Sequence, residues 1–83
     1  MIVRWETDWF LGRVEKLVRD KVLVDCVSYD GNLKFSWPKA KDCTWYTWNE
    51  ILIKNVRVSH YRGTFSLARK YFKNADCLLK SLV

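Results

Sequence analysis

The chain has 83 residues, three cysteines and a net charge of +6 at neutral pH. This length indicates one small domain whose core depends on a few large side chains. The cysteines, Cys26, Cys43 and Cys77, match neither the spacing of a zinc site nor a disulfide framework, so we expect reduced thiols and no metal. The sequence has no signal-peptide pattern and no apolar run near the ~20 residues of a membrane span, so we expect an intracellular protein without membrane contact.

The first two thirds of the chain have the pattern of short β-strands joined by tight turns. We expect strands at residues 1–5, 9–18, 22–29, 33–37 and 51–59. Gly12, inside the second strand, indicates a bulge, a bend or a close backbone approach. Asp30-Gly31-Asn32 is a hairpin signal, and Pro38 should end the strand that follows it, before a polar loop at residues 39–42. Thr47-Trp48-Asn49-Glu50 has the form of a capping box, which predicts a short helical turn before the last strand.

The hydrophobic period changes in the last twenty residues. One helical face would carry Leu67, Tyr71, Ala75, Leu78, Leu79 and Leu82. We expect Thr64 or Ser66 to cap this helix, and the segment Asn74–Asp76 to break it, with Asp76 capping the second piece. The pattern as a whole predicts a mainly β domain, with a five-stranded barrel at residues 1–59 and a C-terminal α-helix at 64–83 packed on it as one unit.

Catalytic chemistry has little support in this sequence. His60 is the one histidine, and it follows Ser59 in a predicted connector with no predicted pocket. The three glycines do not form a phosphate-binding loop. We therefore predict a protein that is not an enzyme and needs no cofactor.

The order of the aromatic residues resembles that of Tudor domains, which are SH3-like barrels of the Royal superfamily. The resemblance runs over residues 2–56 and rests on Trp5, on Trp9-Phe10, on Gly12-Arg13-Val14, on Tyr29-Asp30-Gly31 after a valine-rich strand, and on the capped turn Thr47–Leu52. It implies an SH3/Tudor-like barrel that acts as a chromatin-associated reader in the nucleus. The expected ligand is a methylated lysine or arginine in a basic peptide such as a histone tail.

The resemblance also assigns residues to an aromatic cage. Trp5, Phe10 and Tyr29 would be its walls, and Asp30 a rim acid. Ring faces attract a methylammonium by cation–π interaction, worth about 0.5–2 kcal/mol per good contact. Cys26 stands where the family often has a fourth ring, so that wall would be missing or would be supplied by Trp37 or Trp45. We expect Trp45, Tyr46 and Trp48 to be mainly structural.

Two other functions fit the same sequence. Exposed rings among basic residues also suit DNA or RNA, and the candidate contacts are Lys34, Lys39, Lys41, Lys54, Arg57 and Arg62, with Arg69, Lys70 and Lys73 further along. Alternatively, the terminal helix is a partner or dimer surface and the rings only form a core. The oligomeric state stays open.

Overall fold

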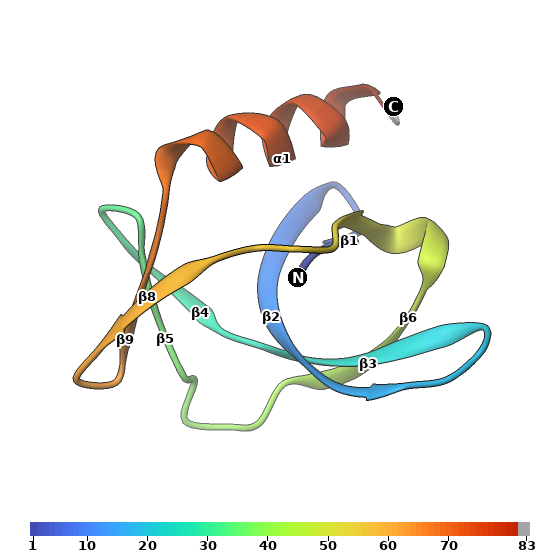
Figure 1. Ribbon diagram of the computed structural model, residues 1–83, viewed down its shortest axis with the longest axis horizontal. Coiled ribbons are helices and arrows are strands. Elements are labelled where there is room, and N and C mark those ends of the chain that lie inside the picture. Colours follow the sequence, from blue (N-terminus) through green and yellow to red (C-terminus); the bar gives the residue numbers. More distant parts are fainter. Residues whose placement is uncertain (82–83) are drawn as a thin grey trace.

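The computed structural model describes residues 1–81. In chain order its elements are β1 (Ile2–Trp5), β2 (Asp8–Leu17), β3 (Lys21–Cys26), β4 (Ser28–Gly31), β5 (Lys34–Ser36), β6 (Cys43–Thr47), the 3₁₀ turn η1 (Trp48–Glu50), β7 (Ile51–Ile53), β8 (Val58–Tyr61), β9 (Thr64–Leu67) and α1 (Arg69–Ser81). The predicted mainly β fold with a C-terminal helix is confirmed (Figure 1). Within residues 1–81, no helix has the length and apolar character to cross a membrane.

The first sheet holds five antiparallel strands in the order β6-β3-β2-β1-β7. It curls strongly, and η1 carries the chain from β6 to β7 (Figure 1). The predicted capping box is confirmed, because the backbone N–H of Thr47 donates to Glu50 Oε1 at 2.9 Å. The two outer strands of this sheet, β6 and β7, do not pair with each other, so the sheet does not close into a barrel.

The second sheet holds four antiparallel strands in the order β4-β5-β9-β8. Its existence corrects two predicted strands. The segment 22–29 divides at Val27 into β3 and β4, and the segment 51–59 divides at residues 54–57 into β7 and β8. Cys26 and Val27 are both buried, so the alternation of a single strand fails there. The Val27 N–H donates to the Leu11 carbonyl at 2.9 Å as the chain passes to the second sheet.

The helix begins later than its apolar spacing predicts. Residues 64–67 form β9, which pairs with β5 on one side and with β8 on the other. Sheet pairing therefore takes Leu67 out of the helical face, and the predicted caps Thr64 and Ser66 are wrong. The helix also runs without interruption through Asn74–Asp76, so the predicted break there is wrong as well. The expected helical role of Leu82 lies outside the described residues.

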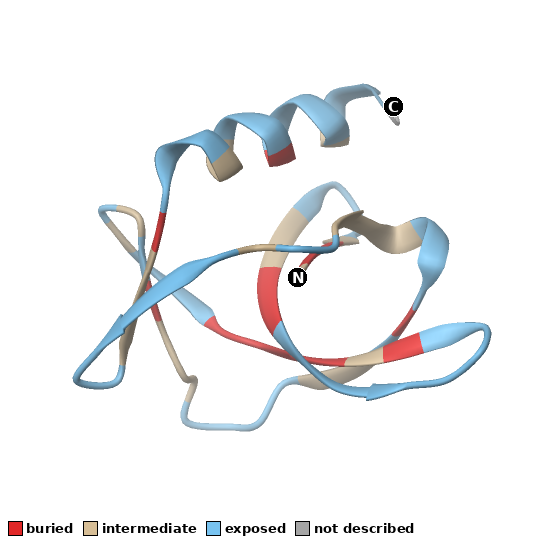
Figure 2. Cartoon of the chain, in the orientation of Figure 1, coloured by how far each residue is buried: buried red, intermediate tan, exposed pale blue. Residues whose placement is uncertain are grey.

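Two clusters of buried side chains form the core. One lies inside the first sheet and comprises Val3, Val22, Val24, Cys26 and Tyr46. The other joins both sheets to the helix and comprises Ile2, Leu11, Val27, Phe35, Leu67 and Ala75 (Figure 2). Gly12 is needed for the close approach between β2 and β3, because a Cβ there would lie 2.3 Å from Val24 Cγ1.

Candidate ligand-binding clefts

The predicted cage residues do not converge on one pocket. Trp5 ends β1 with 49% of its surface exposed, and Tyr29 on β4 is 55% exposed. Phe10 on β2 is half-buried and contributes to two adjoining clefts, one with Trp5 and the other with Tyr29. The two clefts share a second residue, Asp42, from the loop before β6.

The Trp5 cleft has a volume of about 250 Å³ and is lined by Trp5, Phe10, Asp42, Thr44 and Tyr46. The rings of Trp5 and Tyr46 meet edge to face, with centroids 6.3 Å apart and an interplanar angle of 87°. β1, β2 and β6 thus bring three aromatic residues to the same depression, and the loop before β6 adds Asp42. Neither Tyr46 nor Asp42 was assigned to the cage from the sequence.

Tyr46 adjoins Cys26, the residue that stands where a fourth ring was expected. The Cys26 Sγ is 3.6 Å from the Tyr46 hydroxyl, and both residues belong to the buried core. Burial raises the pKa of the Cys26 thiol and that of the Tyr46 hydroxyl, so both groups are neutral at physiological pH. Neither Trp37 nor Trp45 lines the Trp5 cleft. Trp45 is 40% exposed, and the Lys21 Nζ lies 5.1 Å from its ring centroid.

Strand alternation gives a signal for Tyr46. In β6, Trp45 and Tyr46 are neighbours and must point to opposite faces. Tyr46 pairs with Val22, which is fully buried, so Tyr46 takes the inward face and Trp45 the outward one. Recognising the segment 43–47 as a strand would have shown this, because its inward positions are Thr44 and Tyr46, the two β6 residues of the cleft.

The Tyr29 cleft has a volume of about 470 Å³ and joins the two sheets to the helix. Its lining comprises Asp8, Trp9, Phe10, Leu11, Val27, Ser28, Tyr29, Phe35, Asp42 and Phe72. The Tyr29 ring centroid lies 5.0 Å from that of Phe35 and 5.5 Å from that of Phe72. The Tyr29 hydroxyl also accepts a hydrogen bond from the Leu33 N–H at 3.4 Å, so the exposed ring is held in place from both sides.

The charges around these two clefts differ from those of the whole chain. The chain carries a net charge of +6, yet neither lining includes a lysine or an arginine. The charged side chains that line them are the acidic Asp8 and Asp42. Aromatic faces and carboxylates are both complementary to a cation.

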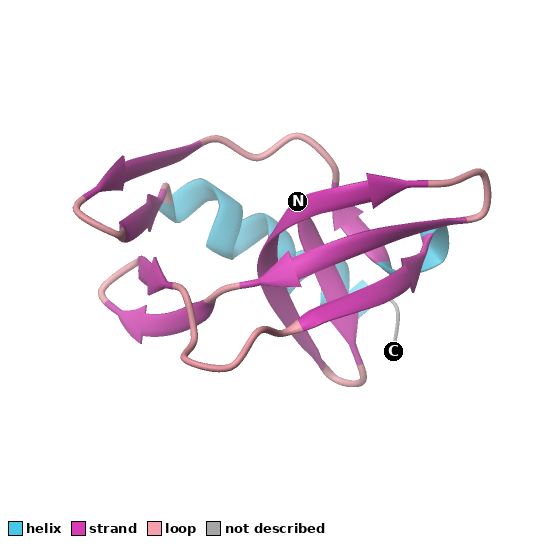
Figure 3. Cartoon of the chain, turned by 90° about the horizontal axis from the view of Figure 1, so that it is seen from below, coloured by secondary structure: helices cyan, strands magenta, loops and turns pink. Residues whose placement is uncertain are grey.

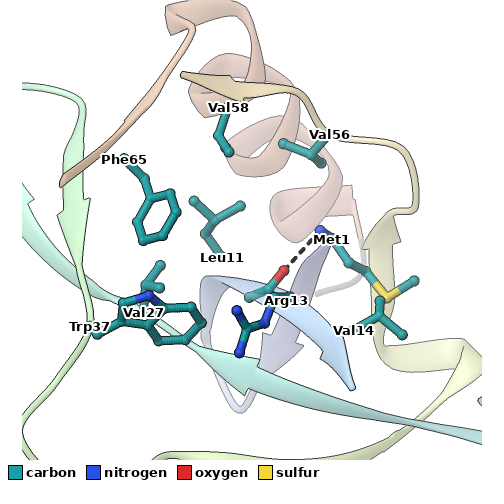
Figure 4. Close-up of a pocket in the computed structure, with 10 residues that line it drawn as sticks. Met1, Leu11, Arg13, Val14, Val27, Trp37, Val56, Val58 and Phe65 are labelled. Atoms are coloured by element: carbon teal, nitrogen blue, oxygen red, sulfur yellow. Dashed lines mark hydrogen bonds between the residues drawn. The ribbon is translucent and has the colours of Figure 1, made fainter. Parts of the chain in front are cut away.

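Trp37 and Asp30 lie outside both clefts. Trp37 packs edge to face on Phe65, with centroids 5.6 Å apart, and the Arg13 guanidinium carbon lies 4.6 Å from its ring centroid. Figure 4 shows Trp37 and Arg13 at an apolar pocket between the sheets. This pocket has a volume of about 280 Å³, and its other lining residues include Leu11, Val27, Val56, Val58 and Phe65. Asp30 is exposed on the β4–β5 hairpin.

The six basic residues predicted for nucleic acid are all exposed but dispersed. Lys34 is on β5, Lys39 and Lys41 are in the loop before β6, Lys54 and Arg57 lie between β7 and β8, and Arg62 is in the β8–β9 turn. The Lys41 Nζ lies 3.9 Å from Asp25 Oδ2, and the Lys54 Nζ lies 5.4 Å from the Trp48 ring centroid. These six side chains are thus distributed over one strand, two loops and one turn.

Residues 1–81 contain no group of three or more His, Cys, Asp or Glu side chains placed to hold a metal ion. His60 stacks on Phe65, with ring centroids 4.8 Å apart.

Comparisons with known proteins leave this site to be interpreted from its own geometry. No protein-family model matches the chain, and neither a curated protein nor a solved structure matches it.

Proposed function

We propose that this chain is a non-enzymatic binding module that recognises a methylated lysine or arginine in a basic peptide, such as a histone tail, within the nucleus. In this proposal the five strands of the first sheet, with η1 before β7, correspond to an SH3/Tudor-like barrel. The second sheet and α1 are additions to that barrel. The order β6-β3-β2-β1-β7 supports the proposal, because the two edge strands of this sheet, β6 and β7, are consecutive in it along the chain and are joined by η1.

The observation that carries the proposal is the separation of charge. A basic protein has placed aromatic rings and acidic side chains, without a lysine or arginine, around two adjoining clefts. Methylation makes an ammonium larger and less hydrated, so it loses less on leaving water for a ring face. In the Trp5 cleft three rings would surround such a group, and Asp42 would add Coulomb attraction.

The same clefts disfavour a phosphate. An anion placed there would meet Asp8 and Asp42 and no basic side chain of the linings. Binding of DNA or RNA would therefore have to use another surface. We accordingly assign the clefts to a cation.

The test is a titration of trimethyl-lysine and dimethyl-arginine histone-tail peptides, with the unmodified peptides as reference, followed by backbone amide shifts. Trp5→Ala should weaken binding about tenfold, which corresponds to one good cation–π contact of about 1.4 kcal/mol. Trp45→Ala is the matched control, because Trp45 has similar exposure but lines neither cleft. Asp42→Asn keeps the shape of the cleft and should weaken binding through charge alone.

Three results would overturn the proposal. The first is no response to any methylated peptide at millimolar concentration, the second is equal affinity for methylated and unmodified peptides, and the third is an equal loss in Trp5→Ala and Trp45→Ala. A tight complex with an oligonucleotide, weakening steeply as salt rises, would instead support nucleic-acid binding at a different surface.

A further inference from the structure

The outer strand β8 is an exposed edge of the second sheet. Among residues 1–81, the order β4-β5-β9-β8 leaves one side of β8 without a partner strand, and all four residues of β8 are exposed. Figure 3 shows this strand at the rim of the molecule, away from the first sheet. Tyr61 is 71% exposed, more than any other large hydrophobic residue of the described chain, and Val58 is 41% exposed. β8 therefore presents backbone groups and apolar side chains together.

The turn after β8 shows which backbone groups point outward. Arg62 and Gly63 have φ values of 50° and 78°, as in a two-residue type I′ turn. Such a turn makes Tyr61 and Thr64 a hydrogen-bonded pair, and the bonding then alternates along the antiparallel ladder. Ser59 bonds β9 in turn, so the N–H and C=O groups of Val58 and His60 point away from the sheet. The edge offers two donors and two acceptors.

Basic side chains surround this edge. Arg57 precedes β8 and Arg62 follows it, with the Arg62 guanidinium carbon 5.2 Å from the Tyr61 ring centroid. A groove of about 510 Å³ runs beside the strand, lined by Arg57, Val58, Ser59, Ser66, Leu67, Ala68, Lys70 and Tyr71, with no acidic residue among them. The Arg57 N–H donates to the Tyr71 hydroxyl at 3.3 Å, which holds the start of β8 against the helix.

We propose that the edge of β8 binds an acidic, extended peptide segment as an added antiparallel or parallel strand. The backbone groups of Val58 and His60 would bond the peptide, and Arg57, Arg62 and Lys70 would attract its carboxylates. The site is separate from the two aromatic clefts and does not depend on the function proposed for them.

Charge and hydrogen bonding select this partner over two others. A second copy of the chain would bring its own Arg57 and Arg62 to the same edge, so like charges would repel. The net charge of +6 on each copy would add to this repulsion. A nucleic-acid backbone offers phosphate acceptors to the N–H groups but few donors for the outward carbonyls. An acidic peptide satisfies both the donors and the acceptors of the edge.

The probe for the test is a nine-residue peptide of alternating glutamate and valine, blocked at both ends and titrated into the full chain at low salt. Amide shifts should concentrate at Val58–Tyr61. Val58→Pro removes one outward N–H without touching the β8–β9 ladder, so it should abolish these shifts. Val58→Ala is the matched control, because it shortens the same side chain and keeps the N–H, and its affinity should stay within about threefold of wild type.

The charge contribution is tested separately. Arg57→Glu with Arg62→Glu should weaken the peptide about tenfold, and an otherwise identical peptide with lysine for glutamate should not bind the wild-type chain. Shifts spread over the whole surface, or equal binding by Val58→Pro and Val58→Ala, would overturn the added-strand proposal. Concentration-dependent dimerisation in analytical ultracentrifugation that is lost in Val58→Pro would overturn the peptide proposal and identify a second copy of the chain as the partner of this edge. Stronger binding of single-stranded DNA than of the peptide, with shifts at the same residues, would also overturn it.

Discussion

At the scale of single residues, Glu6 adopts a backbone conformation that suits glycine. It lies in the two-residue turn between Trp5 and Asp8, which pair at the ends of β1 and β2, and its φ is 56°. An L-residue with a side chain loses about 1–2 kcal/mol in the left-handed region, whereas glycine has no Cβ to clash. The side chain of Glu6 is exposed, so its removal leaves no cavity.

We therefore expect Glu6→Gly to raise the free energy of unfolding by about 0.5–1 kcal/mol, after the larger chain entropy of glycine in the unfolded state is subtracted. Urea unfolding followed by tryptophan fluorescence would measure this change. Glu6→Ala removes the same carboxylate but keeps the Cβ, so it should give no comparable gain. An equal gain in the two variants would attribute the effect to charge rather than to the backbone.

The linings of the two clefts are also a matter of single residues, and the sequence indicated part of them. Trp5, Phe10 and Tyr29 were expected as binding residues, and the structure places all three on the two clefts. Asp42 was missed because it is far along the chain from the turn where a rim acid was expected. Its position follows from the pairing of β3 with β6, where the Cys26 N–H donates to the Asp42 carbonyl at 2.9 Å. Such long-range pairing has no local sequence signal.

At the scale of elements, one contact links the helix to the first sheet by both packing and hydrogen bonding. The Trp9 Nε1 on β2 donates to Asp76 Oδ1 on α1 at 2.8 Å, and the Trp9 ring meets Phe72 edge to face at 5.0 Å. Asp76 was expected to cap a helix fragment. Instead it accepts a hydrogen bond from a residue 67 positions away.

Removal of this hydrogen bond tests how α1 is held. Trp9→Phe keeps a ring against Phe72 but loses the donor, and Asp76→Ala loses the acceptor. Each should lower the free energy of unfolding by about 1 kcal/mol, and the double variant should lose less than the sum, with a coupling of about 0.5–1.5 kcal/mol. Chemical denaturation of the four proteins gives the cycle. Additive losses would mean that the hydrogen bond contributes nothing and that Trp9 acts only by packing.

The element boundaries show where local pattern loses to tertiary pairing. Composition identified the valine-rich and alternating segments as extended, but it missed β6 (Cys43–Thr47) and β9 (Thr64–Leu67). It could not show that the segments 22–29 and 51–59 each supply strands to two different sheets, since the residues at the two division points carry no residue type that marks the end of a strand. Likewise, Leu67 fits the helical spacing, but pairing of β9 with β5 and β8 decides its conformation.

At the scale of the whole molecule, both sheets and the helix share one buried cluster. Ile2 and Leu11 come from the first sheet, Phe35 and Leu67 from the second, and Ala75 from the helix. The strands within residues 1–59 therefore do not have a complete core of their own. Phe35, in particular, has Phe65 of β9 as its cross-strand partner and lies with its ring centroid 5.9 Å from that of Phe72.

This arrangement predicts that residues 1–59, the expected barrel, will not fold when expressed alone. The cut removes β9, α1 and half of β8, so β5 loses its neighbour β9, and Phe35 and Leu11 lose Leu67 and Ala75 from their buried cluster. A chain of this length has a total stability of only about 4–12 kcal/mol, and truncating one buried phenylalanine alone costs about 3–5 kcal/mol. The full chain should unfold in one transition, with the same midpoint by far-UV circular dichroism and by tryptophan fluorescence. The fragment should instead give an amide NMR spectrum with poor chemical-shift dispersion. A dispersed spectrum and a cooperative transition from the fragment would show instead that the cluster formed by Val3, Val22, Val24, Cys26 and Tyr46 is sufficient, and that the second sheet and helix are independent additions.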